Sequence, residues 1–465
     1  MPYNKVTNHI LDKIIEIAGK ESVITSRFDL EPYSKDETED LLFFPEVVVK
    51  PQSVEQIASL LKICNEHFIP VTARGGGTGL SGGALPIHGG VLLSLEKLNK
   101  IIEIDERNLQ ATVETGVITQ VFMDAVAEKG LLYPIDPSSK GSCFIGGNIA
   151  HCSGGPRVVK YGTIREYILN IEMVLPSGEV IWTGANTLKN ASGYSLTQLV
   201  IGSEGTLGIV TKAVVKLIPR PMHNVVMMAA FQSNEQASAA VSAIFRAGVI
   251  PSALEFIERK GVEWVVQYDH IPFHLKDGVA AYLLIEIDGN NMDLIFSDCE
   301  KVNEVLEMNG CVDVLFADTA AQKNELWRIR RVMPVSVKSN SVYKEEDTVV
   351  PRAELPKLLH GIKEIGSKYG FQSICYGHAG DGNVHVNIIK GDMTEDDWTN
   401  KLPEGIKEIF RLTVSLGGTI SGEHGIGLVQ KEYMHIKYSD VHLNIMRGIK
   451  QVFDPNRILN PGKIF

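Results

Sequence analysis

Two short glycine-rich segments near the C-terminal end carry the histidines and acids best placed to do chemistry. In the first, a tight glycine turn separates His378 from a strand on which His385 and Asn387, two residues apart, share one face. Such imidazole pairs suit zinc, manganese or iron, although a purely structural pair is the alternative for any two histidines. In the second, Glu423 and His424 lie between glycines, where irregular backbone lets adjacent side chains point to a common site. Two histidines and one carboxylate leave coordination positions open for a substrate, so we expect a metal-assisted site with His424 as general base.

A third segment, Arg74–Gly83, contains six glycines in ten positions. Glycine serves where backbone takes positive φ or approaches a ligand closely, and successive exposed N–H groups bind anions. The segment fits the G-x-G-x-x-G fingerprint of nicotinamide-binding folds, but that fingerprint opens a helix, and residues 83–90 cannot start a stable one. A second Gly/Ser segment over 137–148 indicates instead one long ligand with a pyrophosphate in the middle. A structural glycine-rich turn is the alternative for the first segment taken alone.

The composition excludes several classes of function. The net charge of −11 disfavours nucleic acid and anionic membrane surfaces, which need clustered Lys and Arg. No apolar run is long enough to cross a membrane, and residues 1–20 have the spacing of an amphipathic helix rather than of a signal peptide. We therefore expect a cytoplasmic protein. None of the six cysteines forms a C-x-x-C pair, so we expect neither an iron–sulfur cluster nor a disulfide framework.

Alternating strand and helix patterns must position these segments. Ser53 begins a capping-box sequence, which predicts the start of a helix after the β-branched run 46–50. The strands and hairpins expected up to the proline pair at 219–221 cover 69–73, 90–95, 101–114, 168–182 and 209–218. Beyond that pair we expect strands over 224–231, 280–287 and 312–316 and helices over 235–247 and 294–308. This order favours an α+β sheet with helices on one face.

Three runs of the sequence resemble the FAD-binding domain of the vanillyl-alcohol-oxidase-type flavoproteins. They are PVTARGGGTGLSGGA from residue 70, GSCFIGGNIAHCSGG from residue 141 and IGSEGTLGIVT from residue 201. Within these flavoproteins the chain is similar to the branch that holds D-lactate dehydrogenase, the glycolate oxidase flavin subunit and D-2-hydroxyglutarate dehydrogenase. The similarity spans residues 46–465 and includes the terminal FDPNRILNPGKIF.

The resemblance implies an α+β chain in three parts. These are a two-lobed FAD-binding domain over 1–221, a ferredoxin-like substrate cap domain with the metal site over 222–410, and a C-terminal segment over 411–465 that returns to the FAD domain. It also implies FAD contacts from Arg74, Gly75, Gly76, Gly77, Thr78, Gly79, Leu80, Ser81, Pro137, Ser142, Cys143, Gly146, Gly147, Ala150, Ser153, Gly155, Glu204, Gly208, Ile209 and Asn460. Some relatives tether FAD through a histidine in the first loop, which this loop lacks, so we expect non-covalent FAD.

The same resemblance assigns roles in the catalytic site. It makes His378, His385 and Glu423 the metal ligands, with zinc as first choice and manganese or iron as alternatives, His424 the base and Asn387 a substrate contact. Arg330, three residues after Trp327 on a helical run, occupies the position of the substrate arginine. Lys344 follows where the hydroxyglutarate branch has a substrate lysine. The interval from Arg330 to Lys344 is one residue shorter than we expect for that branch, and Pro334 stands where the branch has a threonine. Both departures put a dicarboxylate substrate in doubt.

The implied activity is oxidation of a D-2-hydroxy acid to the 2-oxo acid, with D-lactate as first choice and glycolate or D-2-hydroxyglutarate as alternatives. Arg330 would clamp the carboxylate, the metal would lower the hydroxyl pKa, His424 would remove the proton, and hydride would pass to flavin N5. The electrons would then pass to an electron-transferring flavoprotein, an iron–sulfur subunit or a quinone, and such a partner could hold the chain at a membrane. A non-catalytic flavin-binding subunit is the alternative from another class. The oligomeric state stays open, with a homodimer among the alternatives.

Overall fold

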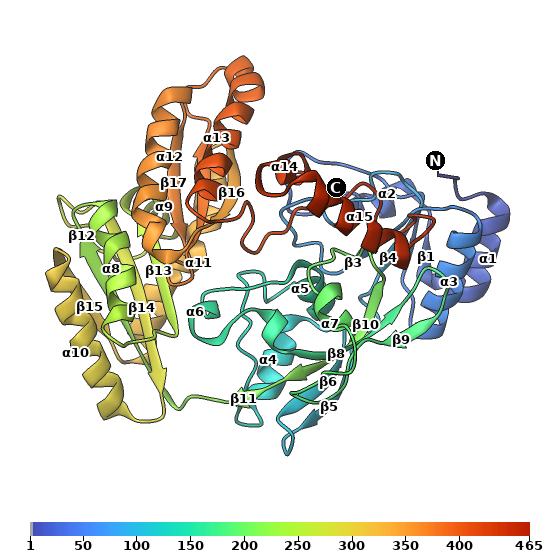
Figure 1. Cartoon of the computed structure of the whole chain (residues 1–465), viewed down its shortest axis with the longest axis horizontal. Helices are drawn as coiled ribbons and strands as arrows, with labels where there is room; N and C mark the ends of the chain where they lie inside the picture. The colour runs from blue at the N-terminus through green and yellow to red at the C-terminus, as the bar shows by residue number, and fades with distance from the viewer. Residues whose placement is uncertain (1–2) are drawn as a thin grey trace. The chain divides into compact units, whose positions relative to one another are not determined.

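Residues 3–465 are described by a computed structural model, in which they form two units (Figure 1). Unit 1 consists of the residues up to 154 together with 163–220 and 423–465, and unit 2 consists of 155–162 and 221–422. Each unit has its own sheets and its own buried apolar core.

The chain crosses from one unit to the other close to two features of the sequence, the second glycine-rich segment and the proline pair at 219–221. From the sequence we placed boundaries after residues 221 and 410. The structure leaves unit 1 after Arg220 and returns to it only after Gly422. Residues 411–422 stay with unit 2 because the backbone groups of Thr419 pair with those of Val349, at 2.9 and 3.3 Å.

Unit 1 contains a sheet with the strand order β1–β2–β4–β3, in which β2, β4 and β3 are parallel. Its strands are β1 (Val23–Ile24), β2 (Val47–Val49), β3 (Val71–Arg74) and β4 (Val91–Ser94). Helix α3 (Val54–Glu66) begins as the sequence predicts, because Ser53 Oγ accepts from the Gln56 N–H at 3.3 Å. The reciprocal bond of a capping box is shifted by one residue, since Gln56 Oε1 accepts from the backbone N–H of Gln52.

A second, antiparallel sheet of unit 1 has the order β5–β6–β10–β8–β9. It is built from β5 (Ile101–Asp105), β6 (Gln110–Glu114), β8 (Ile168–Val174), β9 (Val180–Trp182) and β10 (Ile209–Lys216), and β7 (Leu131–Leu132) pairs separately with β11 (Ile218–Pro219). The remaining helices of this unit are α1 (Asn8–Ala18), α2 (Arg27–Leu30), α4 (Thr119–Ala127), α5 (Ile145–His151), α7 (Leu196–Val200), α14 (Met434–Lys437) and α15 (Asp440–Phe453). The two predicted hairpins, β5–β6 and β8–β9, thus form the two sides of one sheet, with β10 between them.

Unit 2 is built on one antiparallel sheet with the order β15–β12–β14–β13–β17–β18–β16. The strands are β12 (His223–Phe231), β13 (Ala253–Glu258), β14 (Ala281–Gly289), β15 (Cys311–Ala317), β16 (Tyr343–Val349), β17 (Gln372–Gly377) and β18 (Asn383–Ile389). The helices are α6 (Val158–Tyr161), α8 (Asn234–Arg246), α9 (Arg259–Asp269), α10 (Met292–Met308), α11 (Ala320–Asn340), α12 (Leu355–Tyr369) and α13 (Leu402–Ser415), with a π-helical turn at Asp397–Lys401.

Helices cover both faces of this sheet, so the expectation of helices on one face is wrong. Residues of α9 and α11 pack in one apolar cluster with alternate residues of β12, including Val226 and Met228. The intervening residues Val225 and Met227 are equally buried, which requires a second layer on the other face. Helix α8 contacts β12, β13 and β14 and packs against α10 and α12. The expected order of elements lacked β13 and α9, and α9 packs with α11 on the face opposite to α8.

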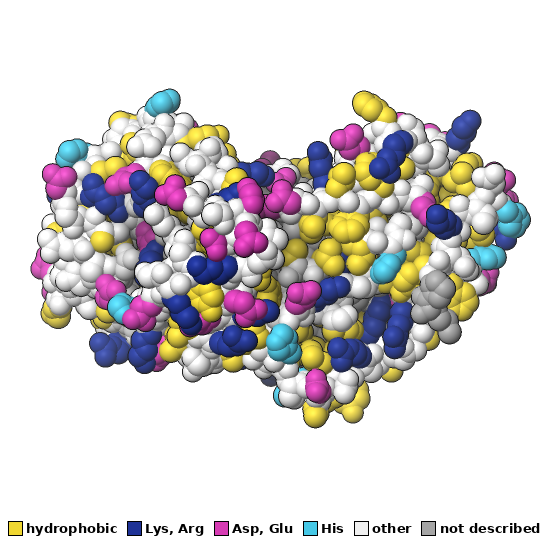
Figure 2. Space-filling model, turned by 90° about the horizontal axis from the view of Figure 1, so that it is seen from above, with side chains coloured by type: hydrophobic (Ala, Val, Ile, Leu, Met, Phe, Trp, Pro, Cys, Tyr) yellow, Lys and Arg dark blue, Asp and Glu magenta, His cyan; other side chains and the backbone are white. Residues whose placement is uncertain are grey.

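On the face drawn in Figure 2, Lys and Arg side chains are interspersed with Asp and Glu. No helix within residues 3–465 combines the length and apolar character needed to cross a membrane.

Candidate functional site

The two glycine-rich loops of unit 1 lie against each other. A Cβ added at Gly76 would overlap the carbonyl oxygen of Ser142, and one added at Gly75 would lie 3.6 Å from the backbone nitrogen of Gly147. Glycine is therefore required at Gly76 for the backbones to approach. The structure thus brings together the two segments that the sequence assigned to one pyrophosphate-containing ligand.

Hydrogen bonds of Asn460 and Glu204 connect this pair of loops to segments of unit 1 that lie far away in the sequence. The Asn460 side-chain amide donates to the carbonyl oxygens of Gly83 and Glu204, both at 2.8 Å. The buried Glu204 carboxylate accepts from the backbone N–H groups of Ile426 and Gly427 at 2.8 and 2.7 Å. Burial raises the pKa of Glu204 above its usual value.

The other residues expected at FAD lie in the same unit with one exception. The exception is Gly155, which is the first residue of the segment counted with unit 2. Cys143 is buried, and its sulfur lies 3.2 Å from the hydroxyl of Thr119. Ser81, at the end of the first loop, donates its hydroxyl to the carbonyl oxygen of His424 at 2.9 Å. The backbone of the expected base is therefore attached to the first glycine-rich loop.

In unit 2, His378 and His385 form a buried pair. His378 follows β17 directly, and His385 lies in β18 after a turn in which Gly382 takes a φ of +87°. The ring centroids are 5.5 Å apart with the planes at 81°, and one nitrogen of each ring lies within 4.8 Å of the other. The predicted turn therefore brings the two imidazoles together.

Glu255 of β13 connects His378 to Arg330. One carboxylate oxygen lies 2.7 Å from His378 Nδ1, and the other accepts from Arg330 Nε at 2.6 Å. All three side chains are buried, Glu255 completely. Burial by itself would raise the pKa of Glu255, but the charges of His378 and Arg330 outweigh it and lower the pKa to about 2. Because Nδ1 of His378 faces this carboxylate, Nε2 is the nitrogen left to bind a metal.

Glu255 is not among the site residues that the sequence predicts. The strand that carries it was not predicted, and one of two acids within the run Ser252–Glu258 gives little signal. Its one distinguishing property is a carboxylate between apolar neighbours, Leu254 and Phe256, in a strand buried on both faces. Such a carboxylate needs a buried partner, and the sequence does not show which one.

The register between β16 and β18 decides which residues of β16 share a face with the histidine pair. Asn387 lies opposite Glu345, and Lys344 lies opposite Ile388. Directly opposite residues of an antiparallel pair point to the same side, and neighbours in one strand point to opposite sides. Glu345 therefore shares the face of His385 and Asn387, and Lys344 does not.

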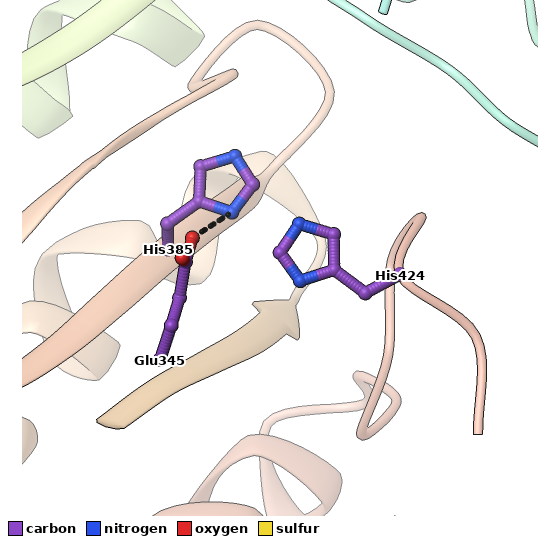
Figure 3. A group of neighbouring side chains, drawn as sticks. All are labelled: Glu345, His385 and His424. Atoms are coloured by element: carbon purple, nitrogen blue, oxygen red, sulfur yellow. Dashed lines mark ion pairs between the residues drawn. The ribbon is translucent and has the colours of Figure 1, made fainter. Parts of the chain in front are cut away.

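The substrate role expected for Lys344 stays a prediction, and the register places its side chain on the other face of the sheet from His385 and Asn387. Its ammonium lies 5.9 Å from the ring centre of Trp398, in the π-helical turn, and the structure does not bring it to the histidines. Glu345 instead forms an ion pair with His385, with a carboxylate oxygen 3.3 Å from Nδ1 (Figure 3). Each histidine of the pair therefore has a carboxylate at its Nδ1 atom.

Tyr376 is a second residue that the sequence analysis did not single out. It lies opposite His385 in the pairing of β17 with β18, and the two ring centres are 5.5 Å apart. The Arg330 guanidinium lies over the ring of Tyr376, 5.0 Å from the ring centre. Burial first and the Glu345 charge second raise the pKa of Tyr376 well above its usual value, so its hydroxyl stays protonated.

Asp347 holds the chain just before Glu423 and His424. Its carboxylate accepts from the backbone N–H of Gly422 at 2.8 Å and from the Ser421 hydroxyl at 3.1 Å. The Asn383 amide donates to the other carboxylate oxygen at 2.6 Å. Glu423 and His424 then follow Gly422 directly in the chain (His424 is labelled in Figure 3).

Two family models match almost the whole chain. Residues 45–184 match the FAD binding domain, and residues 220–464 match the C-terminal domain of FAD linked oxidases. The chain belongs to the FAD-linked oxidase family. It is an FAD-linked oxidoreductase, and the resemblance drawn from its three glycine-rich runs is confirmed.

Several relatives in this family are similar over their full lengths. The glycolate oxidase subunit GlcD of Bacillus subtilis (strain 168) is 38% identical over 99% of this chain and 97% of its own. A D-lactate dehydrogenase of Anaerostipes hadrus is 38% identical over 99% of this chain and 98% of its own. A D-2-hydroxyglutarate dehydrogenase of Stutzerimonas stutzeri (strain A1501) is 31% identical over 98% of both chains.

Solved structures of more distant proteins share the fold. p-Cresol methylhydroxylase superposes with a TM-score of 0.81 at 22% identity, over 98% of this chain and 96% of its own. The 4-ethylphenol oxidase of Gulosibacter chungangensis superposes with a TM-score of 0.78 at 20% identity, over 100% of this chain and 98% of its own. These likenesses confirm the α+β fold of the vanillyl-alcohol-oxidase type.

Proposed function

We propose that this FAD-linked oxidase oxidises a D-2-hydroxy acid to the corresponding 2-oxo acid, with D-lactate as its substrate. The observation that carries the proposal is the buried group of Arg330, Glu255, His378 and His385 in a chain of this family. It offers a guanidinium for a carboxylate beside two imidazoles. The relatives named for glycolate, D-lactate and D-2-hydroxyglutarate all act on 2-hydroxy acids.

Arg330 is the cation for the substrate carboxylate. A guanidinium has five N–H donors in a planar fork that matches a carboxylate, and the Arg330 Nε donates to Glu255 at 2.6 Å. Glu255 keeps the guanidinium in place and keeps its charge compensated while the site is empty of substrate. Asn387, which is completely buried on the face of His385, is the residue we assign to a further polar contact with the substrate.

The donor set fits a divalent metal. Carboxylates face Nδ1 of both His378 and His385, so each Nε2 would bind the ion, and Glu423 would supply the third ligand. Zinc is our first choice, with manganese or iron as alternatives. When bound, such a metal lowers the pKa of a substrate hydroxyl. Non-covalent FAD supplies the two-electron acceptor, and the two glycine-rich loops of unit 1 hold its pyrophosphate.

His424 removes the proton of the substrate hydroxyl. Its chain is fixed on one side through Ser81 and on the other through Gly422. Proton transfer by a positioned side chain of this kind accelerates a reaction by a factor of about 10²–10⁴. Turnover would require a separate electron acceptor, for which we propose an electron-transferring flavoprotein, an iron–sulfur subunit or a quinone.

Anaerobic bleaching of the flavin tests the proposal. The FAD-loaded enzyme is mixed with D-lactate, L-lactate, glycolate or D-2-hydroxyglutarate, and the loss of flavin absorbance is followed. We expect D-lactate to bleach the flavin fastest. The His424→Ala variant should retain FAD but bleach at least about 100-fold more slowly, because it lacks the base.

The matched control is His435→Ala, which removes an exposed histidine from α14 and should bleach like the wild type. Failure of every hydroxy acid to bleach the wild-type flavin would contradict the proposed function. Unchanged bleaching by His424→Ala would contradict the assignment of the base and leave the reaction class standing.

A further inference from the structure

A carboxylate occupies the face of the sheet on which the proposed substrate binds. The face is shared by the β16 and β18 residues Tyr343, Glu345, Asp347, Asn383, His385, Asn387 and Ile389. Among these described residues none is Lys or Arg. The one lysine of β16, Lys344, points to the opposite side and lies near Trp398.

Glu345 is the acid on this face with access to solvent. Its side chain is 15% exposed, whereas that of Glu255 is completely buried. The Glu345 carboxylate lies 3.3 Å from His385 Nδ1, and Asn387 is its direct partner across the strands. Its charge is also felt at the hydroxyl of Tyr376, over whose ring the Arg330 guanidinium lies. Glu345 therefore belongs to the same group of side chains as the cation that we assign to the substrate carboxylate.

The balance of charge in this group suits one substrate carboxylate and opposes a second. Arg330 would pair with the carboxylate beside the reacting carbon. A carboxylate at the far end of a dicarboxylic acid would meet Glu345 on a face without a lysine or arginine in β16 or β18. Two like charges a few ångströms apart in a partly buried place repel strongly, and specificity is often obtained by such repulsion.

We propose that Glu345 is a specificity-determining residue that restricts this enzyme to monocarboxylic 2-hydroxy acids by repelling a second carboxylate. The inference rests on the proposed function and narrows its substrate class. It predicts that D-2-hydroxyglutarate and D-malate are poor substrates of the wild-type enzyme for reasons of charge rather than of length.

A pair of acids matched in shape separates charge from size. D-2-hydroxyisocaproate carries an isopropyl group where D-malate carries a carboxylate, and the two groups are similar in volume. The measured quantity is the ratio of kcat/KM for D-2-hydroxyisocaproate to that for D-malate, in the wild type and in Glu345→Gln. We expect a ratio above about 100 in the wild type and at least a tenfold lower ratio in the variant, through a lower KM for D-malate. Glu345→Lys should lower the ratio further.

If the change at Glu345 disturbs His385, kcat/KM falls for both acids. This shared loss cancels in the ratio. Glu364→Gln is the control, because it removes an exposed carboxylate from α12 and should leave the ratio unchanged. FAD content, read from absorbance, shows that each variant is folded and loaded.

The outcomes for the inference and for the proposed function are distinct. A wild-type enzyme that oxidises D-malate as well as D-2-hydroxyisocaproate overturns the inference without any variant, and leaves the proposed function standing. An unchanged ratio in an FAD-loaded Glu345→Gln enzyme also overturns it. If no 2-hydroxy acid reduces the wild-type flavin, the proposed function fails and the inference falls with it.

Discussion

At the scale of the residue, two carboxylates, one of them completely buried, contact the histidine pair. Glu255 bridges His378 and Arg330, and Glu345 faces His385. A carboxylate at Nδ1 fixes both the tautomer and the orientation of an imidazole and raises its basicity as a ligand. Replacing Glu255 removes the compensating charge of a buried guanidinium, which is among the most costly changes in a protein interior.

The Glu255→Gln variant should lose stability in a pH-dependent way. At pH 7 we expect the free energy of unfolding to fall by about 3–5 kcal/mol, because Arg330 keeps a buried charge without its anion. The folded-state pKa of Glu255, about 2, lies below the unfolded value of about 4.3, so its stabilisation is complete above pH 4.3. It is lost as the pH falls from about 4.3 towards 2. Denaturant unfolding at several pH values measures the difference between the two proteins.

The difference between wild type and variant should therefore shrink below about pH 4.3. Glu364→Gln, at an exposed position, should match the wild type at every pH. A difference that stays constant from pH 7 to pH 3 would show that the ionised carboxylate is not the source of the effect.

At the scale of the element, the glycine-rich loops depend on backbone contact rather than on side chains. The first loop follows β3 and the second precedes α5, and the two meet at Gly76 and Ser142. Gly77 at the same place has a φ of +70°, which disfavours any other residue. A side chain at Gly76 would separate the loops that we assign to the FAD pyrophosphate, whereas one at Gly77 would meet the guanidinium of Arg74.

Gly76→Ala should weaken FAD binding by at least about tenfold, since the added Cβ overlaps the carbonyl oxygen of Ser142 and backbone cannot move aside cheaply. The matched control is Gly141→Ala, in the second loop, where an added Cβ meets no atom within 4 Å. Titration of the apoprotein with FAD, followed by quenching of flavin fluorescence, gives both dissociation constants. Equal affinities in the two variants would contradict a tight contact between the loops.

At the scale of the whole molecule, the chain is divided into units with separate cores and separate chemistry. Unit 1 contains both glycine-rich loops, and unit 2 contains Arg330 and the histidine pair. The segment from Ser421 to His424 leads from one unit to the other, with its backbone held by Asp347 at one end and by Ser81 at the other. His424, which we propose as the base, therefore lies two residues after the last residue of unit 2 in the chain.

Removal of FAD should destabilise unit 1 selectively. We expect calorimetry to resolve two unfolding transitions, of which only one moves to lower temperature in the apoprotein. Ligand present at about 1,000 times its dissociation constant stabilises the form that binds it by about 4 kcal/mol, which corresponds to several degrees. Adding FAD back is the control and should restore the first transition. A single transition, or an equal shift of both, would contradict separate stability of the units.

The sequence by itself determined what depends on local backbone chemistry. The start of α3 at Ser53, the glycine-rich loops and the turn between His378 and His385 could be predicted, because caps and glycine turns are encoded within a few residues. The family resemblance rests on the same local runs. Strand β13 was missed, since a strand buried on both faces has no alternating pattern to reveal it. Helix α9, which follows it directly, was missed as well.

Only the tertiary structure decided which acids stand beside the histidines. Glu255 reaches His378 across 123 residues of sequence, and nothing in the intervening chain specifies that contact. Lys344 and Glu345 are neighbours, and the register of β16 with β18 alone determines which of them shares the face of His385. A shift of one residue moves every side chain of a strand to the other face, so strand pairing, rather than spacing along the chain, sets the charge of the proposed substrate site.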